Sequence, residues 1–361
     1  MLEIPYVRHP LKFPARYAHG PDSFPQPGVP RGELHEYEWN ASRVFPGTHR
    51  RYWVYVPAQY SDSKPASLMV FQDAEWYLDL DREDRASIVF DNLIHHGEMP
   101  VTIGVFVAPG EPGRRNIEYD AFSDAYAAFL LTEILPAVQS RYAITDDPYR
   151  WAIGGGSSGG SCAFTAAWMR PDRFQRVLSF VGSFAQLHGG IRYPELILEA
   201  PKKPVRIFLH TVTRDLNWNA PRNNWVSENL RVAAALAERG YDFRFVLGDG
   251  AHDGNHSGVI LPDALRWLWR PESSEHLAAG PLECGGEVGV SEFHHRSART
   301  SAAGSSLVPG DAHRRRDYPS GARECEPERD QADRNAHHRP ERACCSMRVI
   351  EQHPAHERTC E

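Results

Sequence analysis

The fold of this 361-residue chain is decided by the stretch Trp151-Ala152-Ile153-Gly154-Gly155-Gly156-Ser157-Ser158-Gly159-Gly160. Its apolar start predicts a short strand, and the alanine- and aromatic-rich residues 161–169 predict a helix after the glycines. A serine in a sharp strand-to-helix turn, with only small neighbours, is typical of a nucleophile elbow. The first N–H groups of the helix would point to the place where an oxyanion forms. The stretch therefore predicts a nucleophilic serine, with a merely structural turn as the alternative.

Two overlapping registers of the G-x-S-x-G pattern leave the nucleophile open at this point. Gly155-Gly156-Ser157-Ser158-Gly159 makes Ser157 the nucleophile, whereas Gly156-Ser157-Ser158-Gly159-Gly160 makes it Ser158. The strand can reach the bend in either register, so the local pattern favours Ser157 only weakly. Phosphate binding is not indicated, because the glycines have neither the lysine of a P-loop nor the G-x-G-x-x-G spacing.

An acid and a base follow the serine in the chain order that one large class of serine enzymes uses. Residues 205–210 are predicted to form a strand, and Asp215 lies in the polar loop after them. Residues 243–247 alternate as a strand and lead to His252 in a glycine-rich loop. Ser157, Asp215 and His252 thus each follow a predicted strand. Competing candidates are Asp146, Asp147, Asp249 and Asp253 for the acid and His256 for the base.

These motifs resemble the enterochelin esterase-like branch of the α/β-hydrolases, which carries a G-x-S-x-G-G elbow and a late G-G-H loop. The matching segments are residues 155–160 and Gly250-Ala251-His252, and the double glycine after the elbow selects Ser157 over Ser158. Residues 52–57 look like the family's early strand, and residues 68–73 look like the strand before its oxyanion loop. Residues 129–138 look like the helix before its elbow.

The resemblance extends over about residues 30–270 and departs from the family at two positions. Ala74 follows Asp73 where relatives commonly have glycine, and Ala251 precedes the histidine in place of glycine. Neither change removes a reactive group. The first one concerns the backbone of the expected oxyanion loop.

The resemblance implies an α/β-hydrolase fold and a serine carboxylic-ester hydrolase that works through an acyl-enzyme. Ser157 would attack the ester, His252 would be the base, and Asp215 would orient the imidazole. The oxyanion donors would be the N–H of Ser158 and a second N–H from Ala74 or Glu75. No metal and no organic cofactor is expected. The alternatives are an acyltransferase that uses the same triad and a non-catalytic, hydrolase-like binding domain.

Substrate contacts are predicted from the loops beside the triad. Trp76, Tyr77, Trp218 and Trp225 flank the oxyanion and acid loops and could stack on a sugar or an aromatic acyl group, or could be core or lid packing. Arg115 and Glu118 lie in a polar loop after a predicted strand. They are expected either to bind substrate or to form a structural pair. The expected partner is a small-molecule ester.

The predicted architecture is a mostly parallel sheet flanked by helices. Two antiparallel strands are expected first, at residues 33–40 and 50–56. The parallel core strands are expected at residues 68–72, 102–107, 151–155, 177–182, 205–210 and 243–247. The triad candidates follow the carboxyl ends of these strands, where ligand sites of such sheets lie.

Three regions differ in composition. Residues 1–30 form a proline-rich arm, residues 31–270 carry the apolar runs of a catalytic domain, and residues 271–361 are rich in Arg, His, Ala, Glu and Gly. The last region has too few apolar residues to offset its ordering entropy and is predicted to be disordered. Its cysteines lack the paired spacing of a zinc site.

Charge and hydropathy restrict the partners and the location. The net charge of −7 disfavours nucleic acid as a partner. The first 30 residues lack the apolar core of a signal peptide, and no run approaches the ~20 apolar residues of a membrane span. A cytoplasmic protein without membrane contact is therefore expected, and the oligomeric state stays open.

Overall fold

A computed structural model describes residues 15–111 and 113–271 of the chain. The chain divides into two units, residues 1–284 and 285–361, and all described residues belong to the first unit. The predicted disordered region, except Pro271, lies outside the described residues, as do the first 14 residues of the arm.

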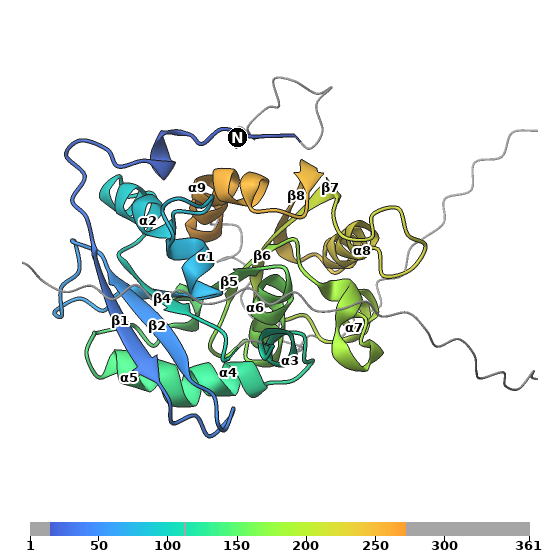
Figure 1. Ribbon diagram of the computed structural model, residues 1–361, viewed down its shortest axis with the longest axis horizontal. Helices are drawn as coiled ribbons and strands as arrows, with labels where there is room; N and C mark the ends of the chain where they lie inside the picture. The colour runs from blue at the N-terminus through green and yellow to red at the C-terminus, as the bar shows by residue number, and fades with distance from the viewer. Residues whose placement is uncertain (1–14, 112, 272–361) are drawn as a thin grey trace, which may run out of the picture. The chain divides into compact units, whose positions relative to one another are not determined.

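An eight-stranded sheet forms the centre of the described unit (Figure 1). Its spatial order is β1-β2-β4-β3-β5-β6-β7-β8. The strands are β1 (Glu33–Trp39), β2 (Arg50–Val56), β3 (Ser67–Gln72), β4 (Thr102–Val107), β5 (Trp151–Gly156), β6 (Arg176–Phe180), β7 (Arg206–Arg214) and β8 (Asp242–Ala251). Every predicted strand is present, and β7 and β8 run several residues beyond their predicted ends.

The sheet is mixed, and its pairing confirms the predicted α/β class. β2 pairs antiparallel with both β1 and β4, whereas the pairs from β4 through β3, β5, β6 and β7 to β8 are parallel. The carboxyl ends of β5, β7 and β8 therefore meet at one edge of the sheet.

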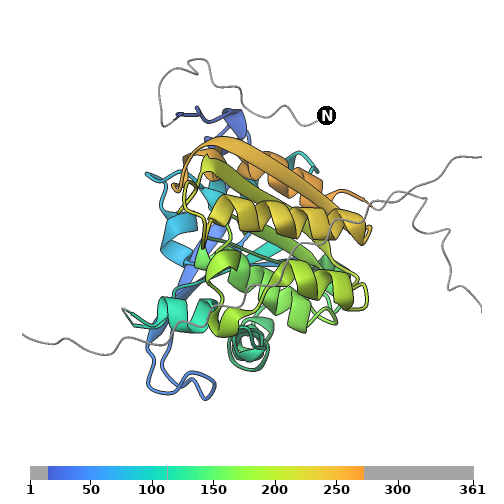
Figure 2. The same ribbon diagram turned by 90° about the vertical axis from the view of Figure 1, so that its right-hand side faces the viewer.

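Helices cover both faces of the sheet (Figures 1 and 2). One face is covered by α3 (Arg115–Tyr119), α4 (Ala125–Phe129), α5 (Leu135–Gln139), α6 (Ser158–Met169), α7 (Tyr193–Glu199) and α8 (Trp225–Glu238). The other face is covered by α1 (Ala74–Leu78), α2 (Ala86–His95) and α9 (Asn255–Trp269). Short turns complete the described elements, namely η1 (Pro21–Ser23), η2 (Leu130–Ile134), η3 (Pro148–Arg150), η4 (Phe184–Gln186) and η5 (His188–Gly190).

The core lies in two layers, one on each face of the sheet, because both faces are covered. In β3, Leu68 and Val70 belong to the layer under α6, and Met69 and Phe71 belong to the layer under α2 and α9. All of β3 is buried. A strand that is buried on both faces reads as a continuous apolar run, which is why its position could be predicted.

The predicted helix at residues 129–138 is interrupted. The chain forms α4, then one π-helical turn (η2), and then α5, which has Pro136 at its start. A proline has no N–H and its ring collides with the carbonyl of the residue four positions before it. The wider π-turn accommodates this break in the hydrogen-bond ladder.

Residues 15–30, the described part of the arm, are held against the body. The N–H of Tyr17 donates to Asn255, its carbonyl accepts from the same side chain, and its hydroxyl accepts the N–H of Asp249. The Asp22 carboxylate pairs with Arg266 of α9. This segment therefore packs on β8 and α9, the elements on either side of the predicted catalytic histidine.

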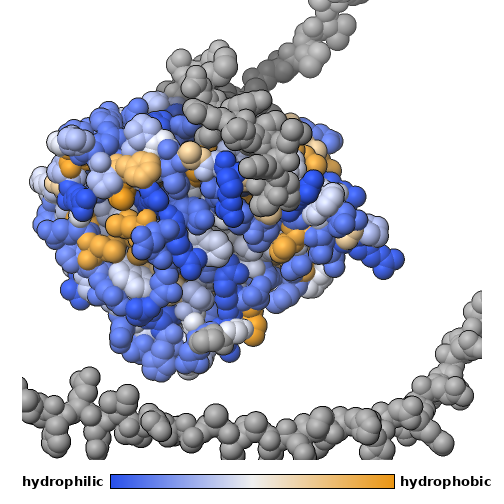
Figure 3. Space-filling view, turned by 45° about the horizontal axis from the view of Figure 1, so that its top comes forward, coloured by the Kyte–Doolittle hydropathy of each residue, from blue (hydrophilic) through white to orange (hydrophobic). Residues whose placement is uncertain are grey.

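The surface carries small apolar groups. On the face drawn in Figure 3, hydrophilic residues separate the apolar ones. Among the exposed large apolar side chains, Trp76 lies in α1, and Leu216 and Trp218 lie in the loop after β7. In the described part of the chain, no helix combines the length and the apolar character that a membrane span needs.

Candidate active site

The turn between β5 and α6 holds Ser157 in a rare backbone conformation, with φ 59° and ψ −126°. Such a conformation costs about 1–3 kcal/mol and persists only where neighbouring structure enforces it. Here the N–H of Ser157 donates to the carbonyl of Phe180 at 2.9 Å, and the N–H of Ser183 donates to the carbonyl of Ser157 at 3.2 Å. Both contacts attach the turn to the end of β6. The serine thus lies half-buried at the carboxyl edge of the sheet.

The glycines around Ser157 allow close backbone contacts. A Cβ at Gly155 would lie 2.5 Å from the backbone of Gly159, and one at Gly160 would lie 2.9 Å from the carbonyl oxygen of Phe180. Real Cβ atoms do not approach so closely. The glycine pattern of the sequence therefore reflects packing of the strand against the first turn of α6.

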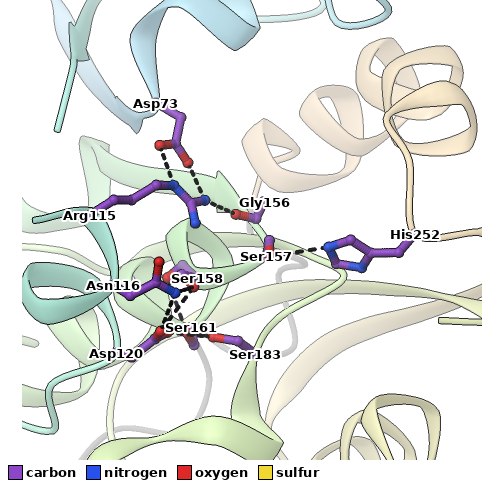
Figure 4. Close-up of polar contacts among 10 residues, drawn as sticks. All are labelled: Asp73, Arg115, Asn116, Asp120, Gly156, Ser157, Ser158, Ser161, Ser183 and His252. Atoms are coloured by element: carbon purple, nitrogen blue, oxygen red, sulfur yellow. Dashed lines mark hydrogen bonds and ion pairs between the residues drawn. The ribbon is translucent and has the colours of Figure 1, made fainter. Parts of the chain in front are cut away.

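Ser157, His252 and Asp215 form one chain of hydrogen bonds. His252 Nε2 lies 3.1 Å from Ser157 Oγ, a contact drawn in Figure 4, and His252 Nδ1 lies 2.5 Å from Asp215 Oδ1. Asp215 directly follows β7 and His252 directly follows β8. Since β7 and β8 are parallel neighbours, their ends bring the acid and the base together.

The surroundings of Asp215 fix the proton positions of the imidazole. Its side chain is fully buried and also accepts the Thr211 hydroxyl at 2.7 Å and the Leu216 N–H at 2.8 Å. An ionised carboxylate only accepts, so His252 Nδ1 carries the proton and Nε2 is left to accept from Ser157. The Trp225 ring packs edge-on against His252, with centroids 5.1 Å apart.

The competing candidates have other partners. The Asp249 carboxylate accepts the Thr213 hydroxyl, and Asp253 lies 3.8 Å from Arg16. His256 contacts His210, with Nδ1 and Nε2 2.9 Å apart. Asp147 accepts the N–H of Tyr149 before β5. Asp146 lies beside Asp147, at the opposite end of β5 from Ser157.

A small cavity opens beside Ser157. It is lined by Asp73, Trp76, Tyr77, Gly156, Ser157, Val181, His252 and Asp253. Ser158 is the first residue of α6, and Ala74 and Glu75 are the first two of α1. The first N–H groups of a helix have no partner inside it. The predicted oxyanion donors thus belong to two helix starts, and Asp73 before Ala74 has a left-handed φ of 56°.

Arg115 ties the two sides of this cavity together (Figure 4). Its guanidinium donates to both carboxylate oxygens of Asp73 at 2.7 Å and to the carbonyl of Gly156 at 3.3 Å. Arg115 is not a lining residue of the cavity beside Ser157. It lines a wider groove that also includes Arg51 and Glu75.

The prediction for Glu118 is corrected by the structure. Its fully buried carboxylate receives two hydrogen bonds from the Arg50 guanidinium, at 2.9 and 3.0 Å. Arg115 and Glu118 thus each have a different partner and do not form the predicted pair. Both oxygens of this carboxylate are thus occupied by Arg50, and Glu118 lines neither the cavity nor the wider groove.

The two exposed tryptophans predicted near the site lie in different places. Trp76 is 39 % exposed and lines the cavity, whereas Trp218 is 46 % exposed and lies against the Arg214 guanidinium, outside the lining residues. Tyr77 is buried beneath the cavity, and burial raises the pKa of its hydroxyl well above the ordinary value. Tyr77 therefore stays neutral.

Sequence reasoning missed several residues at the site. Val181 lines the cavity with a left-handed φ of 43°, which is rare for a β-branched residue. The buried Asp120 and Ser183 and the exposed Asn116 form a polar group below Ser157. None of them belongs to a motif, and only the fold brings them together. Among residues 15–111 and 113–271, no group of three His, Cys, Asp or Glu side chains is placed to hold a metal ion.

The sheet order, the elbow and the solved structures that match define the class of this chain as the α/β-hydrolase fold. An enterobactin esterase from Shigella flexneri, solved with 2,3-di-hydroxy-N-benzoyl-glycine present, matches with a TM-score of 0.58 and 23% identity over 71% of this chain and 63% of that one. A ferulic acid esterase from Anaeromyces mucronatus matches with a TM-score of 0.54 and 18% identity over 69% of this chain and 93% of that one.

The chain belongs to the family described as "Putative esterase", which matches residues 44–258. The iron(III) enterobactin esterase of Escherichia coli K12 is 26% identical over 251 residues, which are 68% of this chain and 59% of that protein. The chain thus spans less than two thirds of the length of this relative. The resemblance inferred from the elbow and the G-A-H loop is confirmed.

Proposed function

We propose that this protein is a serine carboxylic-ester hydrolase in which Ser157 is the nucleophile, His252 the base and Asp215 the orienting acid. The observation that carries the proposal is the chain of hydrogen bonds from Asp215 through His252 to Ser157, which ends at a cavity. Membership of the esterase family supports it. A merely structural turn would need neither the base nor the buried acid.

The reaction would proceed in two steps. Ser157 Oγ attacks the ester carbonyl while His252 Nε2 takes its proton, and the alcohol leaves with that proton. Water then attacks the acyl-enzyme through the same base and releases the carboxylic acid. Asp215 holds the Nδ1 proton and stabilises the imidazolium in both steps. The 20 % exposed imidazole allows water to reach it.

The oxyanion would be held by the N–H of Ser158 together with that of Ala74 or Glu75. Each such donor contributes about 3 kcal/mol to lowering the barrier. The two helix starts belong to distant parts of the chain, and the Arg115 bridge from Asp73 to Gly156 fixes their relative position. We therefore assign Arg115 to holding the oxyanion site together.

We propose that the substrate carries an aromatic ring near the ester. The relatives' names and ligands include enterobactin, an N-benzoyl-glycine and ferulic acid. In this chain, Trp76 presents an exposed aromatic side chain at the cavity that contains Ser157. Aromatic faces stack favourably on such rings.

The test is hydrolysis of p-nitrophenyl acetate and ethyl ferulate by the full chain, together with fluorophosphonate labelling. Ser157→Ala and His252→Ala are expected to lower turnover by about 10⁵–10⁶ while the protein stays folded. The label should map to Ser157 by mass spectrometry, and Ser158→Ala should still be labelled. If the label mapped to Ser158, then Ser158 and not Ser157 would be the nucleophile.

The same assay separates the alternatives. Product analysis with added acceptor alcohols distinguishes hydrolysis from acyl transfer, because a transferase would form the new ester in preference to the free acid. Folded protein with neither turnover nor label would contradict the proposal and favour a binding domain.

A further inference from the structure

A polar group, buried except for Asn116, lies below Ser157 and is separate from the Ser-His-Asp chain (Figure 4). Its centre is Asp120, which directly follows α3 and is 3 % exposed. The carboxylate accepts from Asn116 Nδ2 at 2.8 Å, from the Ser158 hydroxyl at 3.1 Å and from the Ser183 hydroxyl at 2.7 Å. All three donors are neutral.

The carboxylate sets the direction of the hydrogen bonds that Asn116, Ser158 and Ser183 make to it. Asn116 also donates to Ser158 Oγ at 3.0 Å, so the Ser158 hydroxyl accepts from Asn116 and donates to Asp120. The single proton of Ser183 goes to Asp120, and the Ser161 hydroxyl, 2.6 Å from Ser183 Oγ, donates either to Ser183 or to the Ser158 carbonyl at 3.0 Å. An acceptor-only group at position 120 therefore directs the protons of Ser158 and Ser183 towards itself.

Two members of the group, Ser158 and Ser183, connect Asp120 to the turn that holds Ser157. Ser158 supplies the proposed oxyanion N–H, and its hydroxyl is held by Asp120. Ser183 is held by the same carboxylate, and its N–H donates to the carbonyl of Ser157. A buried carboxylate without a cation among its direct partners is unfavourable unless its hydrogen bonds offset the lost hydration. Here two of those bonds, from Ser158 and Ser183, lead to residues that adjoin or contact the strained Ser157.

We propose that Asp120 is a positioning residue for the oxyanion site, which aligns the N–H of Ser158 and the backbone of Ser157. This inference rests on the proposed ester hydrolysis. An oxyanion donor acts only if it is aligned before charge develops, so its alignment matters more in the transition state than in substrate binding.

Charge and geometry predict opposite results for Asp120→Asn, which keeps the size of the side chain. Removing a negative charge near a developing oxyanion would speed the reaction. An amide at position 120 would instead direct an NH₂ at a donor (Ser158, Asn116 or Ser183) and disturb the alignment. We expect kcat for p-nitrophenyl acetate to fall about 10- to 100-fold.

The expected signature is a separation of kcat from KM. KM should change less than about threefold, while the affinity for an alkyl boronic acid, which mimics the tetrahedral intermediate, should fall by the same factor as kcat. Ser183→Ala, which removes only one of the two connections, should show the same signature with a smaller fall. It also keeps the test possible if Asp120→Asn does not fold.

The matched control is Glu133→Gln. Glu133 is 4 % exposed and also accepts from neutral donors, namely Trp39 Nε1 at 3.0 Å and the N–H groups of Arg43 and Val44 at 2.8 and 2.9 Å. Its loss should lower thermal stability but leave kcat unchanged. If folded Asp120→Asn or Ser183→Ala keeps kcat within twofold, as Glu133→Gln should, speeds the reaction, or changes KM as much as kcat, the proposal is wrong. Wild-type protein without turnover or label would instead overturn the ester hydrolysis, and this inference with it.

Discussion

At the scale of single residues, backbone strain concentrates at the cavity. Asp73, Ser157 and Val181 all have positive φ, between 43° and 59°, and all three line the cavity. Left-handed backbone at a non-glycine residue costs about 1–3 kcal/mol. These residues come from the ends of β3, β5 and β6, so each strand turns sharply where it reaches the site. The chain thus leaves regular structure at the proposed oxyanion loop, at the proposed nucleophile and at one wall of the cavity.

The side chains at the cavity mouth provide a test of substrate class. Trp76→Ala is expected to raise KM for ethyl ferulate about 10-fold, because loss of an aromatic contact and of its buried area costs on the order of 1–2 kcal/mol. KM for p-nitrophenyl acetate, compared with the wild type, should change less, since its acyl group is small.

Trp218→Ala is the comparison for this prediction. Both tryptophans were predicted as substrate contacts, but only Trp76 lines the cavity. Steady-state kinetics with both esters measures the difference. Equal effects of the two substitutions on ferulate hydrolysis would contradict the assignment of the aromatic contact to Trp76.

At the scale of elements, the loop that carries Asp215 is anchored by the start of α8. The Asn224 side chain caps the helix by accepting the N–H of Ser227 at 2.9 Å, and its NH₂ donates to the carbonyl of Trp218 at 2.7 Å. Asn224 thus accepts a hydrogen bond from the first turn of α8 and also holds the loop that carries Asp215. Loss of an asparagine N-cap costs about 1 kcal/mol.

Substitutions of Asn224 should separate the two roles. Asn224→Ala is expected to lower the free energy of unfolding by about 1–2 kcal/mol, whereas Asn224→Asp, which keeps the cap acceptor, should lose less. Urea denaturation monitored by fluorescence measures both. Equal losses would show that the loop contact, and not the cap, carries the stability.

The elements and their order could be predicted because buried parallel strands are short apolar runs and because Ser157, Asp215 and His252 each follow one. The helix before the elbow could be predicted only in part, because Pro136 breaks its hydrogen-bond ladder and a π-turn forms in its middle. The group around Asp120 could not be predicted. Asp120 lies 38 residues from Ser158 and 63 from Ser183, and no local period links residues that meet only across elements.

At the scale of the whole molecule, a buried histidine pair joins the sheet to α9. His210 of β7 and His256 of α9 are both buried, and the ring of Tyr17 from the N-terminal segment packs at a tilt against His256, with centroids 4.2 Å apart. Burial lowers the pKa of His256 to about 4 and that of His210 well below its ordinary value. In the described part of the chain, His210 Nδ1 and His256 Nε2 have no hydrogen-bond partner, so an added proton would find no acceptor.

The pair makes stability depend on pH in a defined direction. In the unfolded chain both histidines bind protons below about pH 6.5, whereas in the folded chain they stay neutral until about pH 4 or lower. Stability is therefore fully present above pH 6.5 and is lost as the pH falls towards 4. For His256 alone the loss is at most about 3 kcal/mol.

Carboxylates also titrate in this window, so the prediction is a difference between variants. His256→Gln is expected to be less stable than the wild type at pH 7.5, because it disturbs packing against Tyr17 and His210, but to lose less stability between pH 6.5 and 4. His188→Gln, a change of an exposed histidine, should lose as much stability as the wild type does over this pH range. Urea midpoints measured between pH 6.5 and 4 test this prediction. If the midpoint of His256→Gln falls with pH as steeply as that of the wild type, the histidine pair is not what makes the fold acid-sensitive.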